Sequence, residues 1–521
     1  PAQNTGAGRG AEKERGFFSM KKAMKKLIAA LLVAAMVCAM AIPAFADGTG
    51  TGTGTGAAAV GTTYTITINN PVGSYEAYQI FSGDLNEGTL SNIAWGTGVT
   101  AAGKTALGNA EDKADALTTS NVKDFAAEVG KYLDAPSGTY AAGQITGLTA
   151  GYYLVKNKAG SVGAGETYTS FILAVVKDVA VSPKGDKPTL EKKVKDAYDT
   201  DGSISGWQDS ADHDIGDDIP FKLTAKIANN FDDYKTYKFV FHDKQSEGLT
   251  FKPDTVEVTV GGTKLTTDQY KVITTTGDDC TFHVVIEDLK LITGAVANGE
   301  VVVEYKSTLN EKAKIGSEGN PNEAHLEYSN NPHDTNGTTT TPKDKVTVFT
   351  FKVVANKTNG ADGQPLKGAA FALYKKDNTG AWNLVSLCNA TGTEGNYTIE
   401  NPNKTDFAWV GLDDGEYMIK EIITPAGFNT IADQTFKVIA THDTDSDDPK
   451  LTVLTGTLES GEIAFAPNNT EGSLTTEIKN NQGTTLPGTG GIGTTIFYVI
   501  GGGLMAAAAI LLITKKRMEN H

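Results

Sequence analysis

Val256-Glu257-Val258-Thr259-Val260 alternates apolar and polar side chains, which is the period of a half-buried β-strand. Clusters of Gly, Asp and Asn separate it from similar runs elsewhere in the chain, at Tyr64 to Ile68, Lys238 to Phe241, Val301 to Tyr305 and Phe371 to Tyr374. Helical patterning is clear only around Asn121 to Leu133. Many short strands separated by turn signals predict an all-β chain of tandem β-sandwiches with Greek-key connections.

Both ends of the chain carry signals for export. Four lysines between positions 21 and 26 precede an apolar stretch from Leu27 to Ile42, which leads into Ala44-Phe45-Ala46. This order predicts a secretory signal peptide over 20–46, with 1–19 as an upstream extension before Met20. Near the other end, Ile496 to Ile513 is apolar and long enough to span a bilayer as a helix. We therefore expect a transmembrane helix over 491–514 and a cytoplasmic basic tail over 515–521.

Between these ends the mature chain is long enough for three domains with real cores. A Gly/Thr-rich leader is followed by strands, and Pro, Gly and Thr interrupt the strands near Ser182 and again between Asn336 and Pro342. Cys280 and Cys388 stand in separate stretches, so disulfides are not expected to hold the protein together. The predicted segments are a leader over 47–60 and domains over 61–183, 184–341 and 342–485.

A short motif lies just before the apolar C-terminal run. The residues are Leu486, Pro487, Gly488, Thr489 and Gly490. This pentapeptide, followed by an apolar helix and a basic tail, resembles the cell-wall sorting signal of Gram-positive surface proteins. The resemblance implies that a sortase cleaves after Thr489 and passes its carbonyl to an amine.

The stretch Gly415-Glu416-Tyr417-Met418-Ile419-Lys420-Glu421 continues into Thr424-Pro425-Ala426-Gly427-Phe428 and resembles the E-box of Gram-positive pilins. The stretch Lys357 to Phe371 is similar to the opening of a collagen-adhesin B-type domain, an immunoglobulin-like β-sandwich. In that family a strand Lys and an Asn on the final strand join in an isopeptide bond. The resemblance implies Lys357 as nucleophile, Asn480 as the amide that loses ammonia, and Glu421 as the acid.

This chemistry requires burial. A buried Lys amine favours its neutral, nucleophilic form, and a buried carboxyl has a raised pKa and can shuttle protons. Alternation puts Lys357 on the same strand face as Phe351, Val353 and Ala355. Lys352 remains a rival nucleophile.

A second set follows from resemblance to pilin and collagen-adhesin A-type domains, in which an Asp takes the place of the Glu. Here Lys192, Asp243 and Asn322 are the implied nucleophile, acid and amide. Lys192 shares a face with Leu190 and Val194, which favours it over Lys193. Asn322 precedes an alternating run and is preferred to Asn330 or Asn331.

The first domain serves as an internal comparison. Gly151 to Asn157 repeats the rhythm of the E-box but places Asn157 where Glu421 stands, and the run Tyr64 to Ile68 contains no Lys. We therefore expect no isopeptide bond there. At its end, Val179 to Lys184 partly resembles the pilin motif, which implies Lys184 as the acceptor of a neighbouring subunit. Lys187 and Lys177 lie nearby.

Other functional classes find little support. The net charge of −16 argues against a nucleic-acid partner. Asp201-Gly202-Ser203-Ile204-Ser205 fits a metal-site pattern, but the sequence around it does not predict the helices and parallel strands that such a site needs. The acidic run Asp443 to Asp448 and the pair Asp232-Asp233 lack the spacing of a calcium loop. We expect no metal and no cofactor. No hydrolase or metalloprotease motif is present, so self-directed amide formation is the only chemistry predicted.

Taken together, the resemblances imply a secreted, cell wall-anchored shaft subunit of a pilus with a role in adhesion and colonisation. The implied partners are a pilus-specific and a housekeeping sortase, further copies of the chain, ancillary pilins and peptidoglycan. A host ligand is not identified by the sequence. The alternative is a wall-anchored adhesin or minor pilin that does not polymerise, and it differs in needing no acceptor at Lys184.

Overall fold

The computed structural model describes residues 61–183, 186–332, 334–483 and 493–518. Strands dominate, as the alternating runs predicted, and the chain divides into two compact units. The first holds the N-terminal and middle domains together with residues 441–452. The second holds 198–202 and the remainder of the chain from Phe351 onward. Each unit is described here by itself.

The N-terminal domain contains two four-stranded sheets, ordered β4-β5-β1-β8 and β3-β2-β6-β7. One apolar cluster contains residues of both sheets, among them Ile66 of β1 and Tyr153 of β6. The other joins the second sheet, through Ile80 and Leu154, to Phe125 and Val129 of a helix. The strands are β1 (Tyr64–Ile68), β2 (Tyr75–Asn86), β3 (Thr89–Trp95), β4 (Thr139–Ala141), β5 (Gln144–Leu148), β6 (Gly151–Asn157), β7 (Ser170–Val175) and β8 (Val179–Val181).

Helices are more numerous in this domain than the sequence pattern indicated. The expected helix around Asn121 to Leu133 is present as α4 (Val122–Val129) and a 3-10 turn, η1 (Gly130–Tyr132). Two further helices, α2 (Ala101–Leu107) and α3 (Ala110–Ala116), precede it. Each has only seven residues, too few to display an apolar period, and each is capped by a side chain, Thr100 for α2 and Asn109 for α3.

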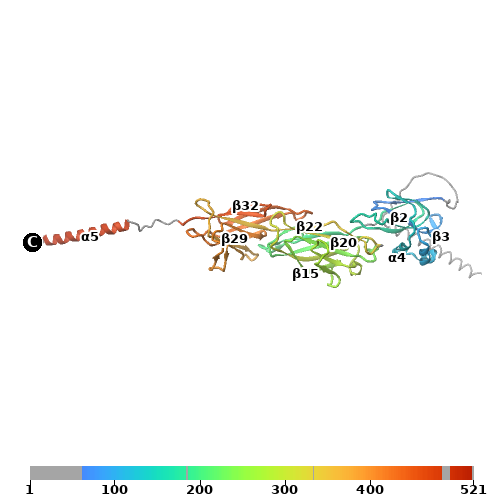
Figure 1. The fold of residues 1–521 in the computed structure, drawn as a ribbon, viewed down its shortest axis with the longest axis horizontal. Helices are drawn as coiled ribbons and strands as arrows, with labels where there is room; N and C mark the ends of the chain where they lie inside the picture. The colour runs from blue at the N-terminus through green and yellow to red at the C-terminus, as the bar shows by residue number, and fades with distance from the viewer. Residues whose placement is uncertain (1–60, 184–185, 333, 484–492, 519–521) are drawn as a thin grey trace, which may run out of the picture. The chain divides into compact units, whose positions relative to one another are not determined.

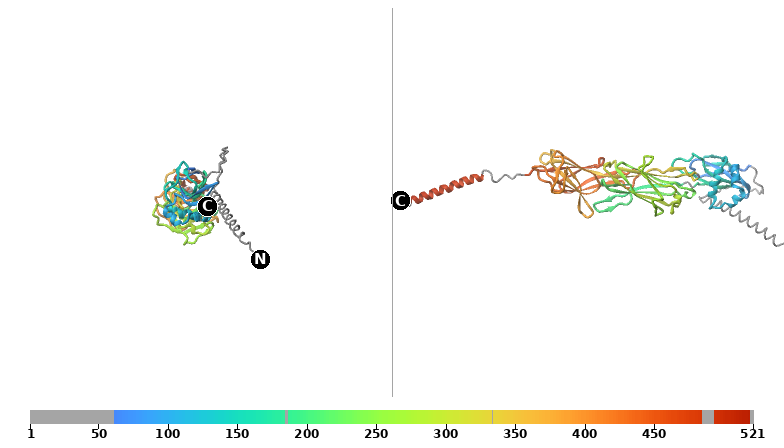
Figure 2. Two further views of the ribbon diagram at one scale, coloured as in Figure 1. Left: turned by 90° about the vertical axis from the view of Figure 1, so that its right-hand side faces the viewer. Right: turned by 60° about the horizontal axis from the view of Figure 1, so that its bottom comes forward.

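The middle domain is a sandwich of two sheets. One has the order β16-β15-β19-β13-β9, and the other β12-β22-β20-β14-β18-β17 with β21 paired to β20. The strands of this domain are drawn mainly in green to yellow in Figures 1 and 2. Its elements are β9 (Thr189–Val194), β10 (Ala197–Tyr198), β11 (Ser203–Ile204), β12 (Ser210–Asp212), β13 (Asp218–Lys226), η2 (Phe231–Asp233), β14 (Phe239–Gln245), β15 (Leu249–Val260), β16 (Thr263–Lys264), β17 (Lys271–Ile273), β18 (Phe282–Ile286), η3 (Leu289–Leu291), β19 (Glu300–Leu309), β20 (Asn320–Ser329), β21 (Thr338–Thr340) and β22 (Asp344–Phe349).

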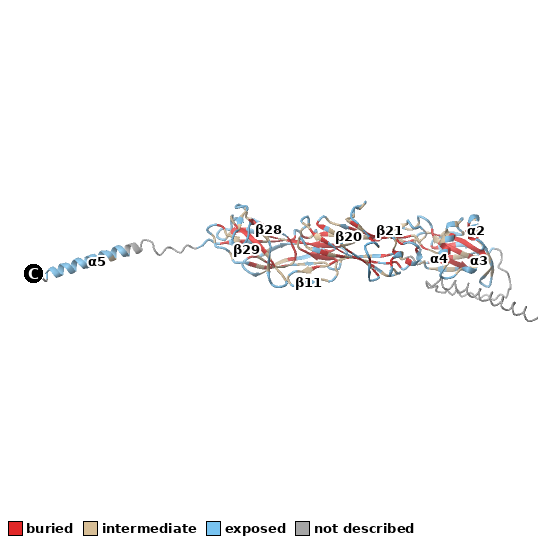
Figure 3. Cartoon of the chain, turned by 90° about the horizontal axis from the view of Figure 1, so that it is seen from below, coloured by how far each residue is buried: buried red, intermediate tan, exposed pale blue. Residues whose placement is uncertain are grey.

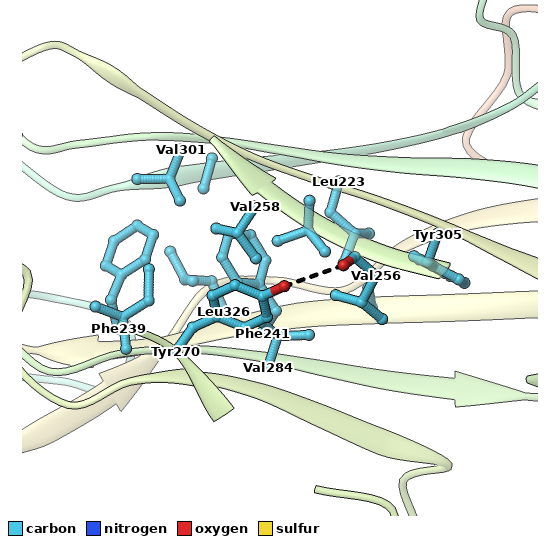
Figure 4. Packing of buried hydrophobic residues seen from close by; sticks show 14 of the residues in the cluster. Leu223, Phe239, Phe241, Val256, Val258, Tyr270, Val284, Val301, Tyr305 and Leu326 are labelled. Carbon is cyan, nitrogen blue, oxygen red and sulfur yellow. Dashed lines mark hydrogen bonds between the residues drawn. The ribbon is translucent and has the colours of Figure 1, made fainter. Parts of the chain in front are cut away.

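The inward faces of these two sheets form one continuous apolar core. Phe239 and Phe241 of β14 meet Val258 of β15 and Val301 of β19, as Figure 4 shows. The Tyr270 hydroxyl, buried at the edge of this core, donates to the Val256 carbonyl at 3.0 Å. The buried residues alternate along each strand, so residues that share a face with this core are removed from water.

The predicted boundary between the middle and last domains, 341/342, lies before the end of the middle sandwich. β22 begins at Asp344 and pairs with β20 in the middle domain's sheet, and the second unit resumes at Phe351. Pro342 lies between β21 and β22, and both of these strands pair with β20, so the chain returns to the same sheet. A proline therefore marks a break in a strand here, not a domain boundary.

The last domain pairs a sheet of order β28-β23-β33-β32 with one of order β25-β24-β29-β30-β31. Its elements are β23 (Phe351–Asn359), β24 (Ala370–Lys376), β25 (Trp382–Cys388), β26 (Ala390–Thr391), β27 (Thr398–Ile399), β28 (Asp406–Leu412), β29 (Gly415–Ile423), β30 (Gln434–His442), β31 (Leu451–Ser460), β32 (Phe465–Asn468) and β33 (Ser473–Asn480). The first and last strands of this domain, β23 and β33, run parallel and adjacent.

The C-terminal helix α5 spans Gly493–Met518, close to the predicted 491–514 and ending four residues later. Its segment Phe497–Met518 has a mean hydropathy of 2.1 and is long enough to cross a membrane. None of it is buried against the protein, in contrast to the strands (Figure 3). An exposed apolar helix of this length fits a segment that crosses a membrane.

Candidate cross-linking sites

The middle-domain site is assembled from both sheets of the sandwich. Lys192 lies on β9 of one sheet, whereas Asp243 on β14 and Asn322 on β20 lie in the other. Alternation turns each of them inward, and all three side chains are completely buried. The register of β14 and β20 pairs Gln245 with Asn322, which places Asn322 diagonally across from Asp243 on the same face.

Hydrogen bonds join the Lys and the acid directly. The Lys192 Nζ donates to Asp243 Oδ2 at 2.5 Å and also contacts the hydroxyl of Tyr305 at 2.8 Å. That hydroxyl donates to Asp243 Oδ2 at 2.7 Å and accepts from Asn322 Nδ2 at 2.9 Å. Tyr305 on β19 is therefore the group that touches the amine, the acid and the amide at once.

The electrostatics of this site favour uncharged partners. Burial lowers the pKa of the Lys192 ammonium, and the attraction of Asp243 only partly opposes this effect. Burial likewise raises the pKa of the Asp243 carboxyl against the influence of Lys192. The rings of Phe221 and Tyr305 flank the amine, with centroids 5.6 and 5.4 Å from Nζ. A neutral amine beside a protonated carboxyl is the arrangement that a nucleophilic attack on an amide requires.

Tyr305 was not singled out from the sequence. The only signal for it was its place at the end of the alternating run from Val301 to Tyr305, where the pattern marks it as a core residue. A tyrosine in a strand is most often a packing residue. The role of its hydroxyl can be recognised only once the residues that face it from the opposing sheet are known. The burial of the hydroxyl raises the pKa of Tyr305 well above its ordinary value, so it is a proton donor and not a charge.

The last-domain site has a different geometry. Lys357 on β23 and Asn480 on β33 lie in the same sheet, on parallel neighbours whose register pairs Lys357 with Ile478 and Asn359 with Asn480. Glu421 comes from β29 in the opposing sheet. All three side chains are buried, with Lys357 only 1% exposed and Glu421 5%.

Here the acid contacts the amide rather than the amine. Asn480 Nδ2 donates to both carboxylate oxygens of Glu421, at 2.9 and 3.0 Å, and to the Asn429 carbonyl at 3.0 Å. The Lys357 Nζ donates to the Ile478 carbonyl at 3.0 Å, one strand away. Burial lowers the pKa of Lys357 to about 8, against the opposing attraction of Glu421. A minority of the amine, far larger than for an exposed lysine, is therefore neutral near physiological pH.

Both sites leave the amide carbonyl without a hydrogen-bond partner. Asn322 Oδ1 and Asn480 Oδ1 are buried and unpaired in the described residues. An unpaired buried amide oxygen is unfavourable, and it is unusual in a well-packed core. At both sites the unpaired oxygen belongs to the carbonyl group that an amine would attack.

The rival residues lie elsewhere. Lys193 points away from the core and its Nζ lies 2.6 Å from Asp209 Oδ1. Lys352 is partly exposed and alternates with the buried Phe351 and Val353. The Asn330 amide contacts the Glu166 carbonyl in the N-terminal domain.

In the N-terminal domain the position equivalent to Glu421 is occupied by an ordinary structural amide. Asn157 is buried, its Nδ2 donates to the Val72 carbonyl at 2.6 Å, and its Oδ1 accepts from the Thr169 backbone at 2.7 Å. Among the buried polar residues of 61–183 there is no lysine. Asn157 therefore joins two loops through hydrogen bonds alone.

The residues predicted for linkage between subunits lie outside the described residues. Lys184 and the five-residue sorting motif, 486–490, belong to this group, as does the predicted signal peptide. The neighbouring candidate Lys187 is exposed and pairs with Glu166 at 2.9 Å, and Lys177 is also exposed. Cys280 and Cys388 are both free thiols, so no disulfide links them.

Three family models match successive parts of the chain. Residues 215–332 match the Gram-positive pilin backbone subunit 2, Cna-B-like domain. Residues 351–452 match the prealbumin-like fold domain SpaA, and residues 478–520 match the LPXTG cell wall anchor motif. The two folded matches contain Asp243 and Asn322 in one case, and Lys357 and Glu421 in the other.

Individual proteins are similar to this chain over different shares of its length. The trypsin-resistant surface T6 protein of Streptococcus pyogenes serotype M6 is 26% identical over 285 residues, which cover 49% of this chain and 46% of that protein. The match thus spans about half the length of this relative. The solved T6 backbone pilin has a TM-score of 0.50 at 19% identity, covering 81% of this chain and 98% of that one. The major pilin SpaD of Corynebacterium diphtheriae gives a TM-score of 0.45 at 18% identity, with 81% and 97% covered.

Proposed function

We propose that this chain, which carries the backbone, prealbumin-like and cell wall anchor domains of the Gram-positive sortase-assembled pilins, is the shaft subunit of a covalently polymerised cell-surface pilus. The anchor motif makes it a cell wall-anchored surface protein, and the apolar helix α5 fits a transient membrane anchor before sorting. The chain belongs to a structural family rather than to an enzyme family.

In the proposed assembly, a pilus sortase cleaves the bond between Thr489 and Gly490 and holds the Thr489 carbonyl as an acyl-enzyme. The amine of Lys184 in another copy attacks this carbonyl, which releases the sortase and forms an amide between subunits. A housekeeping sortase would pass the last subunit to peptidoglycan by the same exchange, and ancillary pilins would join through their own sorting motifs.

Two internal amides are proposed to reinforce each subunit. In each, the Lys Nζ bonds to the Asn Cγ and the amide nitrogen departs as ammonia, so one proton must move from the amine to the leaving nitrogen. In the middle domain the protonated Asp243 passes its proton to Tyr305 while the Tyr305 hydroxyl gives its own proton to the leaving nitrogen of Asn322, and Asp243 then takes the proton that Lys192 loses. In the last domain Glu421 contacts the leaving nitrogen of Asn480 directly.

The observation that carries this proposal is the distribution of buried Lys, acid and Asn sets. The covalent path from Lys184 to Thr489 passes through the middle and last domains, and both contain such a set. The N-terminal domain lies before Lys184, outside that path, and has Asn157 in place of the acid. Tension along a pilus would load the two cross-linked domains and spare the first.

The first test is the intact mass of the full chain, followed by peptide mapping. The expected result is a mass lower by two ammonias, with one branched peptide joining Lys192 to Asn322 and another joining Lys357 to Asn480. Glu421→Gln keeps the size of the side chain and one acceptor oxygen for Asn480 but cannot move a proton, so it should restore one ammonia and only the last-domain peptide should revert. An unshifted mass of the parent chain, or a cross-link within 61–183, would overturn the internal amides.

The polymer itself has a separate test. In cells that contain a pilus sortase, the chain should form a ladder of covalent multimers that resist boiling in detergent. Lys184→Ala should reduce the ladder to monomer, whereas Lys187→Ala and Lys177→Ala serve as matched controls and should leave it intact. A ladder that survives Lys184→Ala would identify a different acceptor, and its absence from the parent chain would favour the non-polymerising adhesin.

A further inference from the structure

A row of histidines crosses the outer face of the middle domain. His283 of β18 pairs in register with His242 of β14, which pairs in turn with His325 of β20. The ring centroids of His242 lie 4.0 Å from those of His283 and 4.6 Å from those of His325. The whole chain has only seven histidines, and three of them lie side by side on these adjacent strands.

The connection between β17 and β18 brings two more potential ligands to this row. Asp278 lies 3.3 Å from Nδ1 of His242 and 3.1 Å from Nε2 of His283, and the Cys280 sulfur lies 4.0 Å from the same His242 nitrogen. One ligand atom from each of His242, Asp278, Cys280 and His283 falls within 4.8 Å of all the others. Four ligands around Zn²⁺ stand ~3.5 Å apart in a tetrahedron, so small side-chain adjustments suffice to close the set.

The surroundings orient these ligands. His242 Nε2 lies 3.2 Å from Glu327 Oε2, and Lys238 holds the same carboxyl group at 2.9 Å. A proton on Nε2, shared with Glu327, leaves the lone pair of Nδ1 directed at Asp278 and Cys280. A carboxylate behind a coordinating imidazole is the outer-shell arrangement usual in metal sites.

We propose that His242, Asp278, Cys280 and His283 form a zinc site on the outer face of the middle domain. The ligand set of two imidazoles, one thiolate and one carboxylate is the chemistry that Zn²⁺ prefers, whereas Ca²⁺ takes six to eight oxygens. His325 stacks on His242 and supports its ring without belonging to the set. The side chains of His242 and His283 are 12% and 14% exposed and that of Asp278 is 42% exposed, so an ion can reach them from solvent.

The titratable groups of this cluster influence one another. Burial, and then the neighbouring His242, lower the pKa of His283. Burial by itself would raise the pKa of Asp278, but the Cys280 backbone N–H and His283 bring it to about 2. Burial and the charge of Asp278 raise the pKa of the Cys280 thiol to about 12, so zinc must displace the thiol proton. In the bound form the loop carrying Asp278 and Cys280 would be tied to β14 and β18.

The sequence indicated no metal here. Asp278, Cys280 and His283 lie close together in the chain, but His242 lies 36 residues before the first of them. No zinc-finger spacing is present, and only the register of β14 against β18 brings His242 to the other three. This inference does not depend on polymerisation or on the internal amides. Its failure and the failure of the proposed function are therefore separate outcomes.

The test is a titration of the full chain, purified in detergent, reduced and freed of metal, with Zn²⁺ in competition with a chromophoric chelator. One zinc ion should bind per chain. Glu327→Gln should weaken it by roughly 10- to 100-fold through the outer shell, and Cys280→Ser and Asp278→Asn should weaken it further. His325→Phe keeps the ring stack and serves as the matched control, with unchanged affinity.

Cobalt provides a readout that does not depend on affinity. Co²⁺ bound at this site should show a thiolate-to-metal charge-transfer absorption, and this absorption should disappear in Cys280→Ser while the circular dichroism of the sheet is retained. The proposal is overturned if no zinc binds, if zinc binds equally to Cys280→Ser and Asp278→Asn, or if the cobalt complex lacks the thiolate absorption.

Discussion

The middle and last domains contain the same three residue types in two different geometries. In the middle domain the acid contacts the amine, a tyrosine connects both to the amide, and Lys192 faces Asn322 from the opposite sheet. In the last domain the acid contacts the amide, and the Lys and Asn lie on neighbouring parallel strands. The features that the two sites share are a buried amine and an amide carbonyl without a hydrogen-bond partner. The acid contacts the amine in one site and the amide in the other.

The geometry also changes what a cross-link would hold. A bond between Lys192 and Asn322 would join the two sheets of the middle sandwich. A bond between Lys357 and Asn480 would join the first strand of the last domain to its final strand within one sheet. Pulling on the two chain ends of the last domain would shear β23 against β33, and a covalent bond between them prevents that separation.

The largest expected effect is the loss of either amide. Asn322→Ala and Asn480→Ala should each restore one ammonia and lower the free energy of unfolding of the affected domain by roughly 4 to 5 kcal/mol, because each bond closes a loop of more than ~100 residues in the unfolded chain. Calorimetry with the intact mass checks this. Equal thermal transitions in the parent chain and in both variants would mean that the bonds contribute no stability.

Tyr305→Phe distinguishes the two sites. Removing the hydroxyl takes away the proton path to Asn322, so the middle-domain bond should form on the order of 100-fold more slowly, while the last-domain bond is unaffected. The measurement is the cross-linked fraction of each branched peptide with time after synthesis. Tyr417→Phe is the matched control, because that buried tyrosine contacts Asp413 rather than an amide. Equal slowing of both bonds would show a folding defect instead.

A smaller effect concerns pH in the last domain. In Asn480→Ala the Lys357 amine stays free, with its pKa lowered by burial from 10.5 to about 8. Between these values the unfolded chain binds the proton and the folded chain does not, so stability should rise as pH increases from about 8 toward 10.5 and should be flat with respect to this group below 8. The measurement is denaturant unfolding at several pH values.

The control for this pH dependence is Lys357→Met combined with Asn480→Ala, which removes the titrating group. The rise should then disappear. In the parent chain it should also be absent, because an amide nitrogen does not titrate. A rise of equal size in all three proteins would assign it to other residues.

The smallest expected effect is that of the rival lysines. Lys193→Ala and Lys352→Ala should leave both branched peptides in place, because neither side chain reaches the cores that hold the amides. The Lys193 and Asp209 side chains are only 18% and 8% exposed, so loss of their pairing should lower stability by more than the loss of a surface ion pair does, without removing either branched peptide. A missing middle-domain peptide in Lys193→Ala would reverse the assignment of the nucleophile.

The sequence by itself determined the all-β class, because a period of two is written locally in each strand. Tyr64 to Ile68 was predicted with the bounds of β1, and Val256 to Val260 lies within β15. The same local alternation put Lys192 and Lys357 on inward faces, and the short motifs of the last domain and anchor carried the family resemblance. Helices α2 and α3 were not predicted, because seven residues are too few to show a helical period.

Tertiary structure alone decided what the inward-facing residues meet. Tyr305 is part of the middle site because β19 lies in the sheet opposite β14. Whether the acid contacts the amine, as in the middle domain, or the amide, as in the last domain, depends on which sheet carries the lysine. β22 rejoined the middle sandwich after Pro342, and His242 met Cys280 and Asp278 through strand register. Contacts between residues far apart in the chain follow from sheet order and packing, which a local pattern of polar and apolar residues does not encode.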